Sequence, residues 1–130
     1  MNDDRFAQRM DHFYKAVDAL RLALERPEDE FIRDSIIKRF ELGFETARKV
    51  LHQWLVEQQE ISGSATKKEV MEAAFRTALI VDVDLWNEML AYRNDVSHGY
   101  DKGKAMVLVA FVRRRGAAAF DALKQALLTR

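Results

Sequence analysis

Residues 105–112 read "AMVLVAFV", a run of eight apolar residues without one polar position. A run of this length is compatible either with a buried strand or with a buried stretch of helix. The rest of the chain offers no second strand to pair with it, and an unpaired strand would leave its backbone donors and acceptors unsatisfied. The run is therefore predicted to be a helix buried on every side, which makes the whole chain all-α.

Apolar spacing and turn residues on both sides of this run predict further helices. Steps of four and three residues draw a single apolar stripe from Phe6 to Leu24, and Pro27 follows it. The predicted helices cover about residues 6–24, 28–59, 66–80, 82–98 and 101–128. Thr66 with Glu69 forms a capping box for the third of them, and either Asp82 or Asp84 can cap the fourth. The sequence thus predicts one domain, residues 1–130, folded as an up-and-down bundle of four to five helices.

The predicted burial of residues 105–112 also bears on assembly. A bundle of four or five helices has one interior, so a helix apolar on all sides would have a face left over. We therefore expect that face to meet a second subunit in a homodimer.

Composition limits the classes of function. The 130 residues suit a single core, and the 21 basic residues balance the 21 acidic ones, so bulk charge does not attract nucleic acid. The absence of cysteine excludes disulfides and thiol nucleophiles and fits a reducing compartment. No apolar run is long enough to span a membrane, and the N-terminus is charged where a signal peptide is apolar. A cytoplasmic protein is expected.

The stretch "RNDVSHGY", residues 93–100, carries the strongest candidate for chemistry. On an ideal helix Arg93 and His98 lie about 140° apart, whereas Asn94 and His98 share one face. Arg93 and His98 can therefore meet at one phosphate only with help from tertiary structure or from a second subunit. Gly99 is placed where a helix end favours positive φ.

These residue types suit cleavage of RNA without a metal. A histidine can take the proton of a ribose 2′-hydroxyl near neutral pH, and an arginine can bind the phosphate and stabilise its developing charge. Asn94 can orient either group, and the product would carry a cyclic phosphate. The alternative interpretation is a surface arginine followed by a histidine that ends a helix, because so short a spacing arises readily by chance.

Other candidates are weaker. The three histidines, His12, His52 and His98, fall on three different predicted helices, so neither a metal site nor a cofactor is predicted. The arginines at 113–115 favour a solvated face over contacts with RNA or an acidic partner. Glu45 and Lys49 are spaced as a helical ion pair of structural value.

Two longer stretches of the sequence resemble a known family. "IIKRFELGFETARKVL" (36–51) and "FRTALIVDVDLWNEMLAYRNDVSHGYDKGKA" (75–105) resemble the HEPN superfamily, specifically its HepT-type group of nucleotidyltransferase substrate-binding proteins. Residues 93–100 match the Arg-x4-His-x-Tyr signature of that group. The likeness runs from about residue 31 to the end of the chain.

The resemblance implies a helical homodimer with two Arg-His pairs facing each other across a cleft. It implies that Arg93 and His98, with Asn94, form a ribonuclease centre, and that the chain is the toxin of a toxin-antitoxin pair. It further implies that a minimal nucleotidyltransferase, the antitoxin, attaches AMP to Tyr100 and silences the toxin. The alternative within the family is a non-catalytic partner that binds substrate for, or docks, a separate nucleotidyltransferase.

Overall fold

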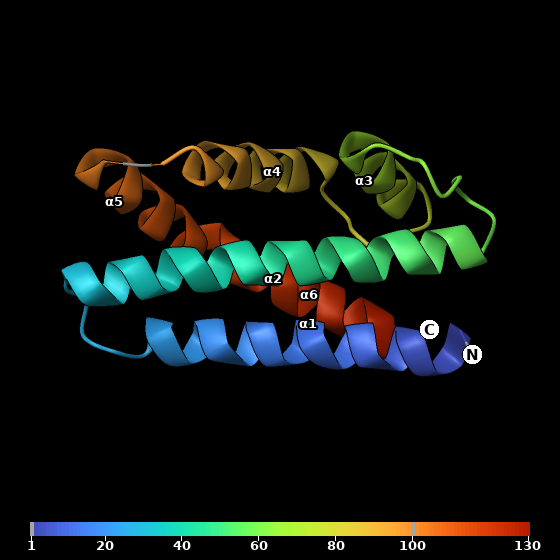
Figure 1. Ribbon diagram of the computed structural model, residues 1–130, viewed down its shortest axis with the longest axis horizontal. Helices are drawn as coiled ribbons and strands as arrows, with labels where there is room; N and C mark the ends of the chain where they lie inside the picture. Colours follow the sequence, from blue (N-terminus) through green and yellow to red (C-terminus); the bar gives the residue numbers. More distant parts are fainter. Residues whose placement is uncertain (1, 100) are drawn as a thin grey trace.

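All regular structure in the part of the chain that the computed structural model describes, residues 2–99 and 101–130, is helical. The elements are α1 (Asn2–Leu24), α2 (Glu30–Glu57), α3 (Lys67–Arg76), α4 (Val83–Ser97), α5 (Lys102–Phe111), η1 (Val112–Gly116) and α6 (Ala117–Leu128) (Figure 1). The all-α prediction is confirmed. Within these residues no helix combines the length and the apolar character that crossing a membrane requires.

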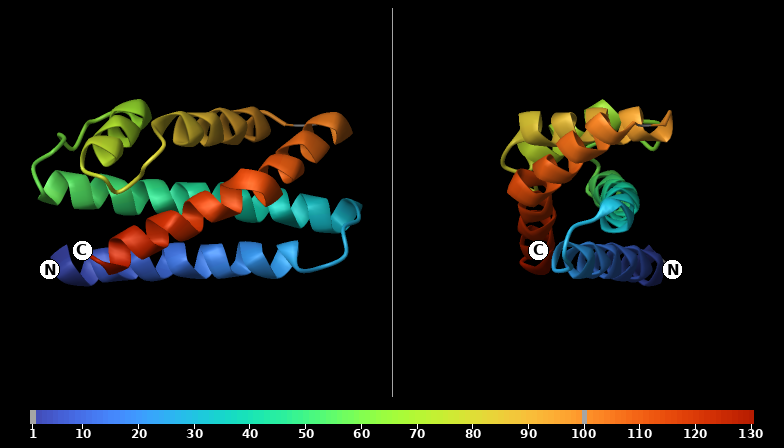
Figure 2. Two further views of the ribbon diagram at one scale, coloured as in Figure 1. Left: turned by 180° about the vertical axis from the view of Figure 1, so that it is seen from behind. Right: turned by 90° about the vertical axis from the view of Figure 1, so that its left-hand side faces the viewer.

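The long helices alternate in direction, as in an up-and-down bundle. In Figure 1, α1 and α2 form an antiparallel hairpin, and α4 lies beside α2 and runs back against it. The last rod, formed by α5, η1 and α6, crosses the hairpin obliquely on the far side of that view, as Figure 2 shows. One broad face of the molecule is thus made by α1, α2 and α4, and the opposite face by the oblique rod.

The last rod differs from the prediction of one uniform helix over residues 101–128. Its extent is confirmed, but a π-helical segment, Val112–Gly116, interrupts the α-helix. This segment contains the arginine run. Arg113 binds Glu28 through Nε at 3.0 Å, and Arg115 lies 3.3 Å from Glu88 and 3.5 Å from Asp82. Two of the three arginines therefore tie the rod to neighbouring elements.

Side-chain caps begin four of the helices. The caps are Asp29, Thr66, Asp82 and Asp101, each accepting a hydrogen bond from the backbone N–H three residues later. Thr66 and Glu69 form the reciprocal capping box that the sequence predicted. Of the two candidate caps for α4, Asp82 makes the bond, with its Oδ1 3.0 Å from the Leu85 nitrogen.

The ends of α2 and α3 were predicted two to four residues too late. After α3, Ala78 adopts φ +65° and the N–H of Leu79 donates to the Ala74 carbonyl, a Schellman motif built without glycine. Gln59 at φ +62° ends α2 in the same way. Sequence reasoning looks for glycine at such positions, so it extended both helices.

An aromatic cluster fills the centre of the bundle. It comprises Phe13, Phe40, Phe44, Trp86 and Phe120, all at most 3% exposed, with the ring centroids of neighbours about 6 Å apart. Gly43 lets α6 approach α2, because a Cβ there would lie 2.8 Å from the Phe120 ring. The cluster joins α4 to the hairpin and fixes the position of the candidate site.

Within one chain, residues 105–112 are buried on one side only, and not on every side. Leu108, Val109 and Phe111 are buried, whereas Met106 and Val107 are 49% and 57% exposed. The segment forms part of an outer layer, so one side covers the core and the other faces outward. The apolar run therefore forms a helix, and a second subunit on its outer side stays a prediction.

Candidate functional site

The predicted catalytic residues lie at the outer end of α4. The helix ends at Ser97, His98 is its C-cap residue, and Gly99 follows at φ +96°. The His98 and Gly99 amides donate to the carbonyls of Asp95 and Val96 at 3.2 and 3.1 Å. Glycine suits this turn because its backbone reaches positive φ without a steric penalty. The turn brings His98 to the surface.

Arg93 is held in place by a carboxylate from α2. Its Nε lies 2.9 Å from Oε1 of Glu45, an ion pair whose N–H direction does not make an aligned hydrogen bond. Arg48 donates to the other oxygen, Oε2, at 3.1 Å. The side chains of Arg93 and Glu45 are each 24% exposed. Glu45 therefore joins two guanidinium groups from different helices.

The electrostatics of this trio keep Glu45 ionised. Partial burial alone would raise the pKa of the Glu45 carboxyl, but the hydrogen bond from Arg48 and the positive charges of Arg48, Arg93 and Lys67 outweigh it. The net effect lowers the pKa below its ordinary value. The trio carries two positive charges and one negative charge, so an anion beside Arg93 meets a net positive site.

Sequence reasoning missed the role of Glu45. It paired Glu45 with Lys49, whereas the carboxylate binds Arg48 and Arg93 instead. The Arg48 partner follows from i,i+3 spacing. The Arg93 partner belongs to another helix, and no local pattern in the sequence indicates it.

His98 and Asn94 are exposed, in contrast to Arg93. Neither side chain makes a hydrogen bond or ion pair with any residue in the described part of the chain. Arg93 and His98 likewise make no direct contact there, as their separation around the helix predicted. Tyr100 lies outside the described residues.

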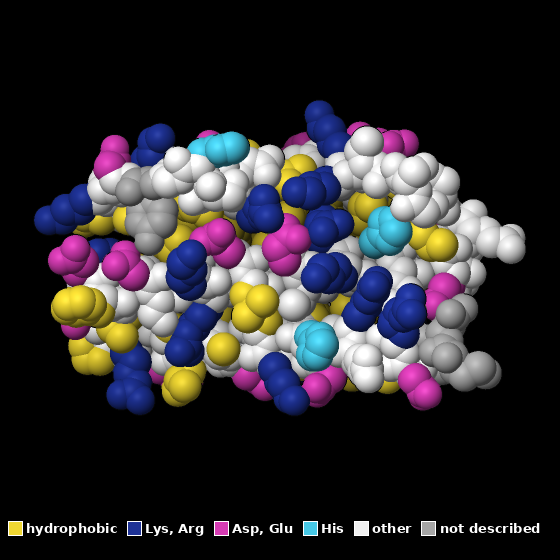
Figure 3. Space-filling view, in the orientation of Figure 1, with side chains coloured by type: hydrophobic (Ala, Val, Ile, Leu, Met, Phe, Trp, Pro, Cys, Tyr) yellow, Lys and Arg dark blue, Asp and Glu magenta, His cyan; other side chains and the backbone are white. Residues whose placement is uncertain are grey.

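The face that carries Arg93 is rich in cations. Figure 3 shows Lys and Arg side chains gathered in a band over α2 and on either side of it, with histidine side chains on the same face. His12 is exposed on α1, and Nε2 of His52 lies 3.1 Å from the Gly63 carbonyl oxygen. Among residues 2–99 and 101–130, no three His, Cys, Asp or Glu side chains cluster as metal ligands.

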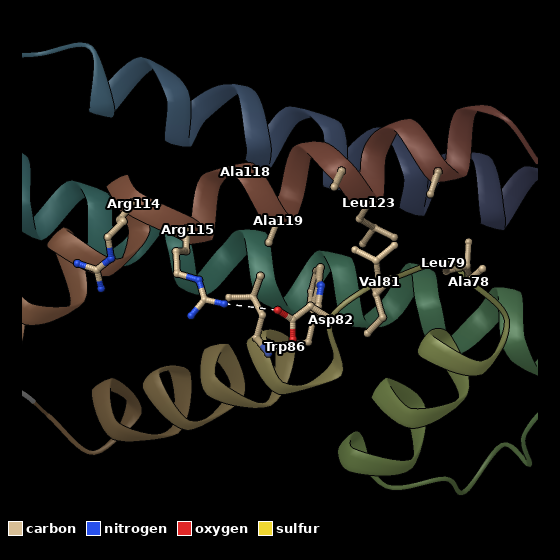
Figure 4. A pocket seen from close by; sticks show the side chains of 14 residues that line it. Ala78, Leu79, Val81, Asp82, Trp86, Arg114, Arg115, Ala118, Ala119 and Leu123 are labelled. Carbon is tan, nitrogen blue, oxygen red and sulfur yellow. Dashed lines mark hydrogen bonds and ion pairs between the residues drawn. The ribbon is translucent and has the colours of Figure 1, made fainter.

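The oblique rod borders an apolar groove of about 340 Å³ (Figure 4). Its walls include four alanines of α6 and Leu123, together with Leu79, Ile80 and Trp86. Arg114 and Arg115 lie at one end, where Arg115 pairs with Asp82. Arg114 is exposed and makes no ion pair with described residues. The groove shares none of its lining with the Arg93 site.

Comparison with known proteins assigns the family. A family model described as "Nucleotidyltransferase substrate binding protein like" matches residues 8–129, which include Arg93, Asn94 and His98. The chain belongs to this family, and the resemblance found in its sequence is confirmed. The comparison with curated proteins gives no significant match.

A solved structure shares the fold. A chain in the crystal structure of a mutant of the toxin-antitoxin pair MntA-HpeT aligns with a TM-score of 0.77 and 14% sequence identity. The alignment covers 98% of this chain and 99% of that chain. At this identity the likeness establishes the helical fold over the full described length.

Proposed function

We propose that this chain is the toxin of a toxin-antitoxin pair and acts as a cytoplasmic, metal-independent endoribonuclease. The observation that carries the proposal is a contrast at the end of α4. Arg93 is anchored by Glu45, whereas His98, five residues later, is exposed and its side chain has no partner among residues 2–99 and 101–130. Membership in the nucleotidyltransferase substrate-binding family supports it. So does the shared fold with a chain from a toxin-antitoxin pair.

In this mechanism His98 is the general base. Its ring takes the proton from a ribose 2′-hydroxyl, and the resulting oxygen attacks the adjacent phosphorus. The bond from phosphorus to the 5′-oxygen breaks, the 5′-oxygen takes a proton from water, and a 2′,3′-cyclic phosphate remains. An exposed ring without a competing partner is accessible to a substrate hydroxyl, which is the first requirement for this role.

Arg93 binds the phosphate that is attacked. Glu45 engages its Nε, and its terminal nitrogens make no hydrogen bond within the described residues, so they are available for two phosphate oxygens. Charge that develops on those oxygens is stabilised by a guanidinium already held in position. Asn94, exposed on the same helical face as His98, orients the ring or the phosphate.

The active assembly is a homodimer in which two such pairs face each other. Within one chain Arg93 and His98 do not touch, because they are separated around α4. An arginine and a histidine would therefore meet at one phosphate only when a second protomer supplies one of them. A cleft between protomers would place four charged or titratable groups around one RNA strand. The exposed apolar side of α5, with Met106 and Val107, is available for such an interface.

Tyr100 is the proposed point of control. A cognate minimal nucleotidyltransferase, the antitoxin, would transfer AMP to its hydroxyl, two residues after His98. The added phosphate is negative and bulky, so it would compete with RNA for Arg93 and obstruct His98.

A second candidate function is a non-catalytic partner that docks a nucleotidyltransferase or presents a substrate to it. The apolar groove beside α6, with the unpaired Arg114 at its end, favours this candidate because such a surface suits a protein partner. It predicts a stable complex with the nucleotidyltransferase and no cleavage of RNA by the chain alone.

The test is incubation of total RNA with the purified chain in EDTA. Wild type is expected to cut, and His98→Ala to cut about 10²–10⁴-fold more slowly, the usual cost of losing a general base. His12→Ala is the matched control, since it removes another exposed histidine, on α1. Equal cleavage by His98→Ala and wild type would refute the mechanism. Intact RNA after incubation with unmodified wild type would favour the docking partner.

A further inference from the structure

A second cationic site lies on the hairpin, away from α4. A hollow of about 220 Å³ between the start of α1 and the last turns of α2 is lined by Arg5, Arg9, His52, Gln53, Val56 and Glu57. None of these residues belongs to the catalytic set proposed above. Two of the six are arginines, and a third is a histidine.

The lining of this hollow contains two arginines and one carboxylate, Glu57. Arg5 and Arg9 stand one helical turn apart, a spacing at which like charges destabilise a helix. Neither makes an ion pair with any described residue. The acidic side chain in the lining, Glu57, accepts a hydrogen bond from Nε2 of Gln53 at 3.0 Å. An anion in the hollow would therefore relieve the repulsion between the two arginines.

The hollow is connected to the Arg93 site along α2. Arg48, which shares Glu45 with Arg93, is one turn before His52, so both side chains lie on the same side of the helix. At the helical rise, the path from Glu45 to Val56 is about 16 Å long. The band of cations in Figure 3 runs along this part of the face.

We infer that this path, from Arg93 past Arg48 to the hollow at Arg5 and Arg9, binds the phosphodiester backbone of single-stranded RNA. The inference rests on the proposed function, because this surface would hold the RNA strand on one side of the bond that the ribonuclease cleaves. Regularly placed cations match the repeated charges of a phosphate backbone. The lining holds no Phe, Tyr or Trp ring on which bases could stack, so the hollow recognises the backbone and not the identity of the bases.

The experiment measures binding separately from cleavage. A short labelled single-stranded RNA is titrated with the His98→Ala chain, alone and with Arg5→Gln and Arg9→Gln added, at several salt concentrations. If both arginines bind phosphates, the double substitution should lower the slope of log K against log salt by about 1.4 and weaken binding roughly twenty-fold near 0.1 M salt. The matched control is Arg114→Gln, which removes an unpaired arginine beside the apolar groove. Thermal unfolding verifies that each variant is folded.

The outcomes separate this inference from the ribonuclease proposal. The proposed RNA path is wrong if the double variant loses no more binding than Arg114→Gln does. It is also wrong if the His98→Ala chain binds no RNA. In both cases the ribonuclease proposal would still be judged by the separate cleavage assay with wild type. A selective loss of binding in the double variant supports the path even if wild type cuts no RNA.

Discussion

The two halves of α4 differ in burial and in the polarity of their side chains. In the first half Trp86 and Met89 are buried, 3% and 0% exposed, and Asp82 caps the helix. In the second half Asn94 and His98 are exposed, and Arg93 is anchored from α2. Packing in the first half fixes where the second half presents its polar groups. Substitutions in the two halves should therefore affect stability and activity separately.

The largest expected effect is on the packed half. Trp86→Ala removes a ring that contacts Phe44 and Phe120, with centroids about 6 Å apart, and should cost about 3–5 kcal/mol of unfolding free energy in urea. The control is Trp54→Ala, since that ring is only partly buried and has Arg130 over it. His98→Ala should change stability by less than about 0.5 kcal/mol. If Trp86→Ala and His98→Ala lowered the unfolding free energy by similar amounts, the two halves of α4 would not differ in this way.

A smaller effect is expected where the second half of α4 is tied to α2 by charge. Glu45→Gln removes the anion between Arg48 and Arg93 and should lower stability at neutral pH by about 0.5–1 kcal/mol, the scale of partly exposed ion pairs. The folded-state pKa of Glu45 is lowered from a value near 4.5. Its contribution is therefore complete above that pH and is lost as the pH falls through the folded pKa.

The measurement is the difference in unfolding free energy between wild type and Glu45→Gln, taken at pH 7 and again well below pH 4.5. The difference should shrink in acid. Glu72→Gln, an exposed carboxylate on α3, supplies the comparison. A difference that is the same at both pH values would show that the carboxylate charge does not contribute.

An effect of similar size is expected at the start of α4. Asp82→Ala removes the hydrogen bond to the Leu85 amide and should cost about 1 kcal/mol by urea unfolding, with cleavage unchanged under conditions where the chain is folded. Asp84→Ala is the matched control, because Asp84 lies in the first turn without making the cap bond. Equal costs for the two would mean that charge near the helix start, and not the cap, is what stabilises α4.

Local signals in the sequence were reliable guides to the fold. The capping box at Thr66 and Glu69 and the apolar stripes are set by neighbours in the chain, so they could be recognised without a structure. The ends at Gln59 and Ala78 could not, because residues with an ordinary preference for negative φ occupy positions that usually take glycine. The exposed side of residues 105–112 also depends on which layer of the bundle the segment joins.

The candidate site is a prediction from the sequence, and the structure adds which of its side chains are paired. The sequence indicated Arg93, Asn94 and His98 as a set, and the family match includes them. The pairing of Arg93 depends on Glu45, which belongs to a distant part of the chain. The hollow at Arg5, Arg9 and His52 has the same origin: two helices supply its cations, and neither contains a recognisable motif by itself.

The π-helical segment at Val112–Gly116 has a consequence for the evolution of chain length. In an α-helix, loss of one residue turns everything beyond it by about 100° and would rotate the buried side of α6 out of the core. A π turn accommodates one residue more than an α turn, so a deletion inside it can be absorbed by closing the segment as ordinary α-helix. Phe111 before it and Phe120 after it would continue to face the interior. Single-residue insertions and deletions among related chains are therefore expected to concentrate at this point of the last rod.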